Sequence, residues 1–123
     1  MERHEKSWGY EIWFQNNDEY CGKMLFVEKD KWSSEGAYHF HIKKHETFFI
    51  VEGILIVDYV DGDAFKRLYL HPNDSFAVPR QMKHRFTSLT EEGCKFIEAS
   101  TPHSNDDSYR VNWNEDEQKW VPK

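Results

Sequence analysis

Short β-type segments follow one another along almost the whole chain, and this succession restricts the fold more than any other feature. Side chains two residues apart lie on one face of a strand, so each segment predicts a strand of about four to eight residues. Gly, Pro, Asn and Asp separate the segments, and Asp61-Gly62 predicts a hairpin. Because no helical pattern intervenes, the chain is predicted to be an all-β antiparallel sandwich or barrel. The predicted strands are YCGKMLFVE, AYHFHI, ETFFIVEG, ILIVDYV, FKRLYL, SFAVP, HRFTSL and KFIEAS.

Length and charge limit the function classes that need to be considered. A chain of 123 residues predicts one domain, and its net charge of -6, with the 16 Lys and Arg scattered, argues against nucleic acid as a partner. No apolar run approaches the roughly 18 residues of a membrane span, and MERHEKSWGY has no signal-peptide core. We therefore expect a soluble, cytoplasmic protein without membrane contact. Cys21 and Cys94 have no ligand spacing and are expected to be buried free thiols.

The stretch HFHIKKHETFFIVEG places two histidines where they can share a ligand. His39 and His41 are two residues apart, so in a strand both imidazoles lie on one face. Glu46 follows His41 by an odd number of residues, so in an unbroken strand its side chain would lie on the opposite face. We expect the chain to bend at IKK so that the carboxylate can join the histidines. A further histidine, His84, follows Pro79 in PRQMKHRF. Together these residues suggest a metal site, whereas an HxH pair alone is weak evidence.

These residues resemble the two motifs of the cupin family. HFHIKKHETFFIVEG is similar to the first motif from His39 to Gly53, and NDSFAVPRQMKH matches the second at Pro79 and His84. The resemblance implies a cupin double-stranded β-helix, which is a jelly-roll β-barrel. It also implies one divalent metal ion, which could be Mn, Fe, Co, Ni or Zn. The ligands that it implies are His39, His41, Glu46 and His84.

The chain departs from the cupin motifs at three glycine positions. Ser33 stands at the leading position of the first motif, and Asn73 and Gln81 stand at the glycine positions of the second. Asparagine tolerates a left-handed backbone, so Asn73 costs little, whereas Gln81 implies a rearranged or strained turn. We expect a single domain over residues 1–123, with a barrel core at about 20–101, an N-terminal arm at 1–19 and a C-terminal tail at 102–123.

The flanks of the domain carry a narrower resemblance. SWGYEIWFQNNDEYCGKMLFVEKDKWSS, FIEAS and NDDSYR resemble the cupin domain of type II mannose-6-phosphate isomerases, and small cupins with suspected sugar specificity share these flanks. The resemblance implies a sugar or sugar phosphate as substrate and isomerisation as the reaction. Glu98 is the expected base, with an exposed strand glutamate as an equally simple interpretation. Lys23, Arg85 and Arg110 could bind a phosphate or hydroxyls, or could be solvated surface charges.

Several alternatives stay open at this point. The same ligands could serve a non-haem iron dioxygenase, the barrel could be a metal-free nucleotide-sugar epimerase, or the domain could be a non-catalytic sugar-binding module. The apolar outer faces and the Trp-rich ends suggest a homodimer. Surface roles are expected for the remaining histidines, which are His4, His45, His71 and His103.

Overall fold

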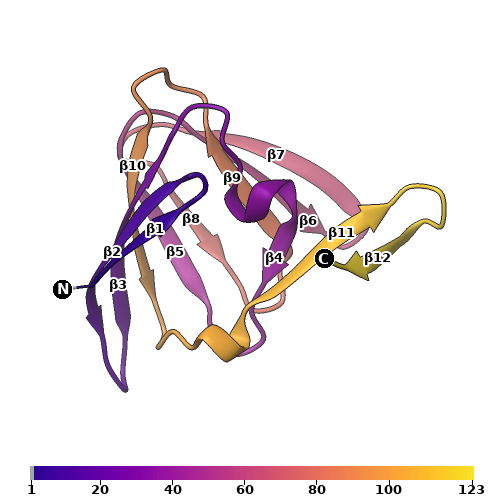
Figure 1. The fold of residues 1–123 in the computed structure, drawn as a ribbon, viewed down its shortest axis with the longest axis horizontal. Helices are drawn as coiled ribbons and strands as arrows, with labels where there is room; N and C mark the ends of the chain where they lie inside the picture. Colours follow the sequence, from indigo (N-terminus) through magenta and orange to yellow (C-terminus); the bar gives the residue numbers. More distant parts are fainter. Residues whose placement is uncertain (1) are drawn as a thin grey trace.

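The computed structural model describes residues 2–123, which form two antiparallel sheets of six strands each (Figure 1). Sheet A has the strand order β1-β2-β3-β10-β5-β8, and sheet B has the order β12-β11-β4-β9-β6-β7. The predicted all-β jelly-roll barrel is thereby confirmed. Sheet A contains β1 (Glu2–Lys6), β2 (Gly9–Asn16), β3 (Cys21–Val27), β10 (Cys94–Ser100), β5 (Glu46–Glu52) and β8 (Ser75–Val78). Sheet B contains β12 (Lys119–Pro122), β11 (Tyr109–Asn114), β4 (Tyr38–Phe40), β9 (His84–Ser88), β6 (Leu55–Asp61) and β7 (Ala64–Leu70).

Two short 3-10 helices interrupt the strands. They are η1 (Ser33–Gly36), which precedes β4, and η2 (Asn105–Asp107), which precedes β11. Within residues 2–123, no helix is long and apolar enough to cross a membrane.

The core lies between the two sheets and is built mainly from large side chains. Alternation places Phe48 and Ile50 of β5 and Phe96 of β10 inside, where each is at most 1% exposed. The rings of Phe48 and Phe96 lie 5.1 Å apart, and Phe86 of β9 packs against both from sheet B. Full burial of such side chains stabilises the fold by about 1.5–3 kcal/mol each. Cys21 and Cys94 are buried and free, as expected.

The predicted hairpin between β6 and β7 is confirmed. Asp61 pairs with Ala64, so Gly62 and Asp63 form the two-residue loop. Gly62 has a φ of 63°, the left-handed value that the primed hairpin turns require.

Both ends of the chain form strands that extend the sheets. The residues assigned to an N-terminal arm form β1 and β2, which pair with each other and then with β3 in sheet A. The residues assigned to a C-terminal tail form β11 and β12, and β11 pairs with β4. The β11–β12 hairpin projects from the barrel in Figure 1. Both terminal segments therefore lie beside strands that carry candidate site residues.

Candidate metal centre and cavity

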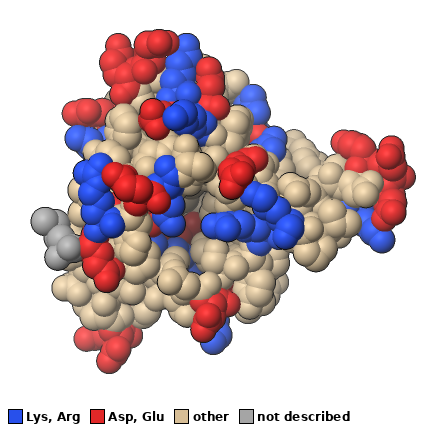
Figure 2. All heavy atoms as spheres, viewed as in Figure 1, with Lys and Arg blue, Asp and Glu red and all other residues tan. Residues whose placement is uncertain are grey.

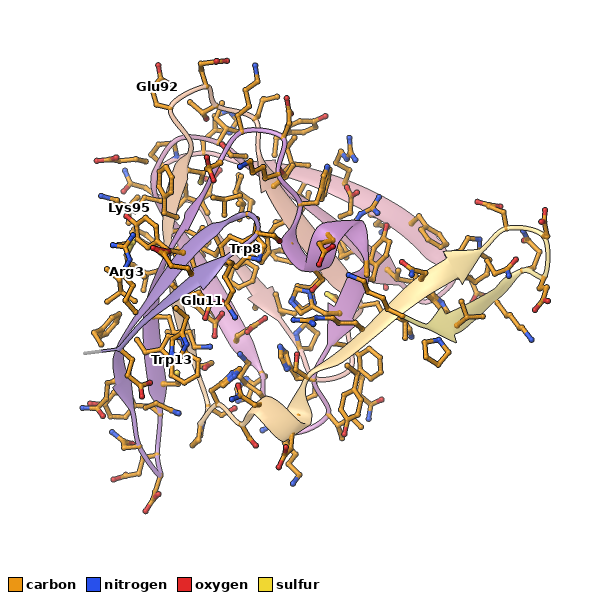
Figure 3. All side chains as sticks on the ribbon, in the orientation of Figure 1. Arg3, Trp8, Glu11, Trp13, Glu92 and Lys95 are labelled. Carbon is orange, nitrogen blue, oxygen red and sulfur yellow. The ribbon has the colours of Figure 1, made fainter. Side chains whose placement is uncertain are left out.

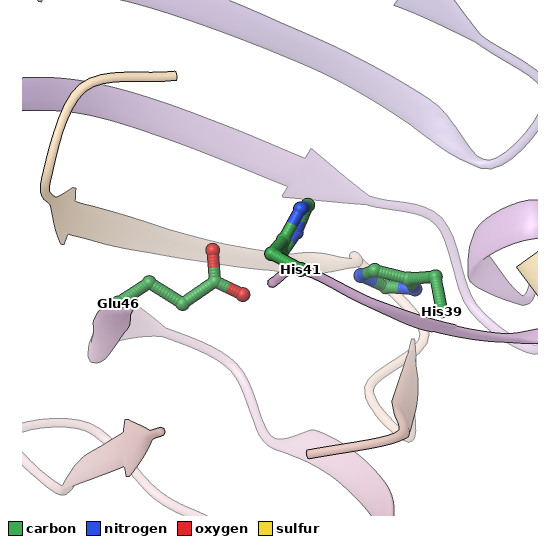
Figure 4. Close-up of side chains that lie close together, drawn as sticks. All are labelled: His39, His41 and Glu46. Carbon is green, nitrogen blue, oxygen red and sulfur yellow. The ribbon is translucent and has the colours of Figure 1, made fainter. Parts of the chain in front are cut away.

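His39, His41 and Glu46 form a compact group inside the barrel (Figure 4). Each offers one ligand atom, and these atoms all lie within 4.8 Å of one another. His39 belongs to β4, His41 follows that strand, and Glu46 is the first residue of β5. The expected bend is present at residues 42–43, and it corrects the parity so that the carboxylate turns toward the rings.

His84 completes the set of four residues that the motifs imply. It is the first residue of β9, pairs in register with His39 and is fully buried. Its Nε2 lies 3.1 Å from Oε1 of Glu46, and its Nδ1 lies 2.9 Å from the carbonyl oxygen of Met82. The bond to the carbonyl orients the ring so that Nε2 faces the group of ligands.

The protonation of the group suits a transition metal. Burial, with the charge of His84, holds the pKa of His39 well below its usual range, and burial with the charge of Lys44 lowers the pKa of His41. Both imidazoles are therefore neutral at pH 7 and keep a lone pair for a metal. Burial alone would raise the pKa of Glu46, but the contact of its Oε1 with Nε2 of His84 and the charge of Lys44 outweigh it and hold that pKa well below its usual range.

Two buried atoms of the group make no hydrogen bond to residues 2–123, and only one of them has an ion contact there. Within the described residues, Nδ1 of His39 and Oε2 of Glu46 are buried and make no hydrogen bond. The latter faces Nζ of Lys44 at 3.0 Å, an ion contact without hydrogen-bond alignment. Two neutral imidazoles and a carboxylate fit a divalent ion such as Mn, Fe, Co, Ni or Zn. The residues present therefore fit the metal that the motifs imply.

A cavity of about 500 Å³ opens beside this group, and Figure 2 shows the molecule hollowed there, between basic and acidic side chains. Residues of both sheets line it, and Trp8, Glu11 and Trp13 on one of its walls are labelled in Figure 3. The charged and imidazole side chains that line it are Lys6, Glu11, Lys23, His39, His41, Lys44, Glu46, Glu98, His103, Arg110 and Lys123.

The carboxyl of Glu98 points into the cavity from β10 and is 5% exposed. Its Oε2 lies 3.0 Å from Nζ of Lys44 and 4.0 Å from Nζ of Lys23. Burial and the nearby charge of Glu46 raise the pKa of Glu98, and the two lysines oppose that rise only in part. A carboxyl with a raised pKa beside a metal group can exchange protons with a bound molecule.

The three residues that were predicted to bind the substrate lie in two different places. Lys23 and Arg110 line the cavity, and Lys23 is 2% exposed. Arg85 is not among the lining residues in the described part of the chain. Its Nε lies 3.0 Å from Oδ2 of Asp58, and its Nη1 donates to the carbonyl of Gly36 at 2.8 Å.

Two cavity residues were not expected there. Lys44 was interpreted as part of a polar bend, yet it is 3% exposed and contacts both Glu46 and Glu98. A surface role was expected for His103, and this is wrong because the residue lines the cavity with Nδ1 3.2 Å from Nζ of Lys23. Burial and the charges of Lys23 and Lys44 lower the pKa of His103 to about 4.

The remaining histidines lie away from the metal group. His45 and His71 are exposed, as expected. His4 is half-buried, with its ring 4.3 Å from that of Trp13. Glu11 and Trp13 of β2 line the cavity, whereas the apolar residues at 10, 12 and 14 would predict that the other face of this strand is buried, so alternation gives no signal for them.

Solved structures with similar folds are 14–17% identical to this chain, a level at which the likeness shows the fold alone. The capsular polysaccharide assembling protein CapF from Staphylococcus aureus is 16% identical, with a TM-score of 0.76 over 87% of this chain and 30% of CapF. Oxalate decarboxylase from Bacillus subtilis is 15% identical, with a TM-score of 0.77 over 89% of this chain and 29% of that protein. KdgF from Halomonas sp. is 16% identical, with a TM-score of 0.70 over 86% of this chain and 92% of KdgF. The chain thus spans about 30% of the length of the first two proteins.

A comparison with curated protein sequences gave no match. The family model described as "Cupin domain" matches residues 26–100. This range contains β5, β9, the four motif residues and Glu98. On this match and on the fold of its two sheets, the chain belongs to the cupin family.

Proposed function

We propose that this cupin is a metal-dependent isomerase of a sugar or sugar phosphate. The proposed ligands of the divalent ion are His39, His41, Glu46 and His84. The observation that carries the proposal is the position of Glu98, a buried carboxyl with a raised pKa that lines the same cavity as the His-His-Glu group. The resemblance of the flanks to type II mannose-6-phosphate isomerases supports the choice of reaction.

In such a reaction one proton moves between two neighbouring carbons and a second moves from the hydroxyl oxygen to the carbonyl oxygen, so no oxidant or reductant is needed. A bound divalent ion would supply a Lewis acid for negative charge on the substrate oxygens. Glu98 would remove the proton from the carbon beside the carbonyl and return it to the adjacent carbon. The ion contact with Lys44 at 3.0 Å would keep the carboxylate oriented between the two transfers.

The charge of the cavity supports an anionic substrate such as a sugar phosphate. Five Lys or Arg and three Glu line the cavity, although the whole chain carries a net charge of -6. Lys6 and Arg110 form no ion pair with any residue of the described chain, so their charges are available to a ligand. We propose that Arg110 and Lys23 contact the anionic or hydroxyl groups of the substrate. CapF, whose name refers to polysaccharide assembly, shares the fold and is consistent with carbohydrate chemistry.

Solvent exchange tests the proposal without knowledge of the product. The protein is loaded with each candidate ion and incubated in D₂O with a panel of aldoses, ketoses and their phosphates, and deuterium at the carbon beside the carbonyl is followed by NMR. We expect exchange with at least one sugar, and Glu98→Gln should lower its rate by about 10²–10⁴-fold. Metal content should stay unchanged in this variant.

The matched control is Glu92→Gln, which removes an exposed carboxylate outside the cavity and should leave the rate unchanged. Equal rates in Glu98→Gln and the control, or no exchange with any sugar and ion, would contradict the isomerase.

A second candidate has its own supporting observation. His39, His41 and Glu46 form a two-histidine, one-carboxylate group, which is the ligand set of many non-haem iron oxygenases. Oxygen uptake by the iron-loaded protein with the same panel would favour this candidate. A non-catalytic sugar-binding module would instead show sugar-dependent thermal stabilisation with neither exchange nor uptake.

We also propose that the protein is a homodimer that buries the outer face of sheet A. Phe49 and Val51 of β5 are 42% and 40% exposed there. Ile97 of β10 lies next to Phe49 in register. A single species of monomer mass in sedimentation at micromolar concentration would contradict the dimer.

A further inference from the structure

A buried carboxylate from the C-terminal segment caps the bend that joins His41 to Glu46. Asp107 ends η2 and is 5% exposed. Its Oδ1 accepts hydrogen bonds from the backbone N–H of Ile42 at 2.9 Å and of Lys43 at 3.1 Å. Its Oδ2 accepts from Lys43 at 3.0 Å and from Lys44 at 2.9 Å. One side chain thus satisfies three consecutive N–H groups that belong to no strand.

The backbone of the same residue orients a proposed ligand. The carbonyl oxygen of Asp107 lies 2.7 Å from Nδ1 of His41. A carbonyl can only accept, so Nδ1 of His41 is the protonated nitrogen and Nε2 keeps its lone pair. A ring fixed in this way is typical of histidines that bind metals.

The chain continues from Asp107 directly into β11, which pairs with β4. Arg110 lies opposite His39 in that ladder. Residues 107–111 therefore run beside both histidines of the HxH pair. This stretch lies beyond residues 26–100, which the family model matches.

A neutral side chain could not replace this carboxylate. An amide offers one acceptor oxygen, whereas three converging N–H groups need the lone pairs of both carboxylate oxygens. A buried N–H that loses its partner destabilises the conformation that buries it. Without Asp107, residues 42–44 would leave the bend, and His41 and Glu46 would no longer face one point.

We propose that Asp107 is a positioning residue that holds the bend in its metal-binding geometry, an inference that rests on the proposed metal site. Its effect on metal affinity acts through His41 and Glu46, since the carboxylate itself is occupied by backbone N–H groups. Loss of such a supporting contact typically weakens metal binding by about 10–100-fold.

The test compares Asp107→Asn with Asp106→Asn, because Asp106 is the exposed neighbour in the same 3-10 helix. Zn²⁺ alone is titrated into each metal-free protein by calorimetry. We expect the Kd of Asp107→Asn to rise by about 10–100-fold and that of Asp106→Asn to stay within about twofold of the wild type. The ring ¹⁵N shifts of metal-free protein should show a second tautomer for His41 in Asp107→Asn and no change for His84.

The outcomes separate this inference from the proposed function. If the wild type binds Zn²⁺ and both variants bind it equally well, the role of Asp107 is refuted and the metal site stands. If the wild type binds neither Zn²⁺ nor any other divalent ion, the metal site fails and this inference fails with it. Circular dichroism verifies folding. If Asp107→Asn does not fold, Asp107→Glu replaces it. A higher Kd is expected for that variant too, because the longer side chain displaces the bend.

Discussion

Lys44 and Glu98 form a buried ion pair beside the proposed metal ligands, with Nζ of the lysine 3.0 Å from Oε2 of the glutamate. The same ammonium lies 3.0 Å from Oε2 of Glu46. One positive charge thus compensates two carboxylates that are almost inaccessible to water. Burial lowers the pKa of Lys44, but the two carboxylates outweigh burial and raise it overall, so the lysine stays charged.

Replacement of this lysine tests how much the pair stabilises the metal-free protein. Lys44→Met removes the nearest counter-charge of two buried carboxylates and leaves Lys23 at 4.0 Å from Glu98, and loss of one partner of a buried pair costs about 3–5 kcal/mol. We expect the free energy of unfolding in urea to fall by this amount at neutral pH. The control Lys66→Met removes an exposed ion pair with Asp61 and should leave the value almost unchanged, because water screens such a pair. A loss of equal size in both variants would contradict the prediction.

His103 makes the stability of the metal-free protein depend on pH. Its folded-state pKa of about 4 lies below the ordinary value of 6.5, so the unfolded chain takes up the proton first as the pH falls. The contribution of the neutral His103 ring to the free energy of unfolding is full above pH 6.5 and is lost as the pH falls toward 4. At pH 5 the loss should be about 1–2 kcal/mol. Urea unfolding of His103→Gln should show a correspondingly shallower pH dependence, whereas His45→Gln, at an exposed site, should keep that of the wild type.

Replacement of the two arginines that were predicted to bind substrate should have different effects on stability and on phosphate affinity. Arg85→Met breaks the bonds to Asp58 and Gly36, and should lower the free energy of unfolding by about 1–3 kcal/mol with unchanged affinity for inorganic phosphate. Arg110→Met should leave stability within about 0.5 kcal/mol and weaken phosphate binding about tenfold. NMR titration and urea unfolding of both variants provide the measurements. Weaker phosphate binding by Arg85→Met at unchanged stability would restore its original assignment.

The turn before β9 stores conformational strain that a glycine can release. Gln81 has a φ of 71°, the left-handed value expected at a motif glycine, and its N–H donates to the carbonyl of His41 at 2.6 Å. Glycine keeps that bond without the steric cost of the Cβ, so Gln81→Gly should stabilise the fold by about 0.5–1 kcal/mol and raise Tm by a few degrees. Gln15→Gly in β2 should lower Tm instead. A lower Tm for Gln81→Gly would show that the turn is relaxed.

Much of the architecture could be predicted because strand periodicity is a local signal. The strand pattern located β5 and β10, and the two-residue spacing of His39 and His41 placed their rings together. A rearranged or strained turn at Gln81 was predicted because only a few residue types tolerate a positive φ, and the structure shows that the residue keeps a positive φ.

The residues that were missed depend on contacts without any local pattern. Lys44 lies in an irregular bend, where neither a two-residue nor a helical period predicts the direction of a side chain. Asp107 reaches that bend across 63–65 residues of intervening sequence, and His103 enters the cavity from a loop. These side chains are buried because of the way the two sheets pack together. The local periodicity of the sequence carries no information about that packing.

The irregular backbone between β4 and β5 also sets how fast an ion could leave. Glu46 begins a strand that is paired on both sides, and His84 begins β9, which lies between β4 and β6. The N–H groups of the bend after His41 bond to the side chain of Asp107 and not to a neighbouring strand, so residues 42–44 can open when these bonds break while every ladder of the barrel stays intact. We therefore expect ion dissociation to follow this local fluctuation, and a bound ion to exchange with solvent many times within the lifetime of one folded molecule.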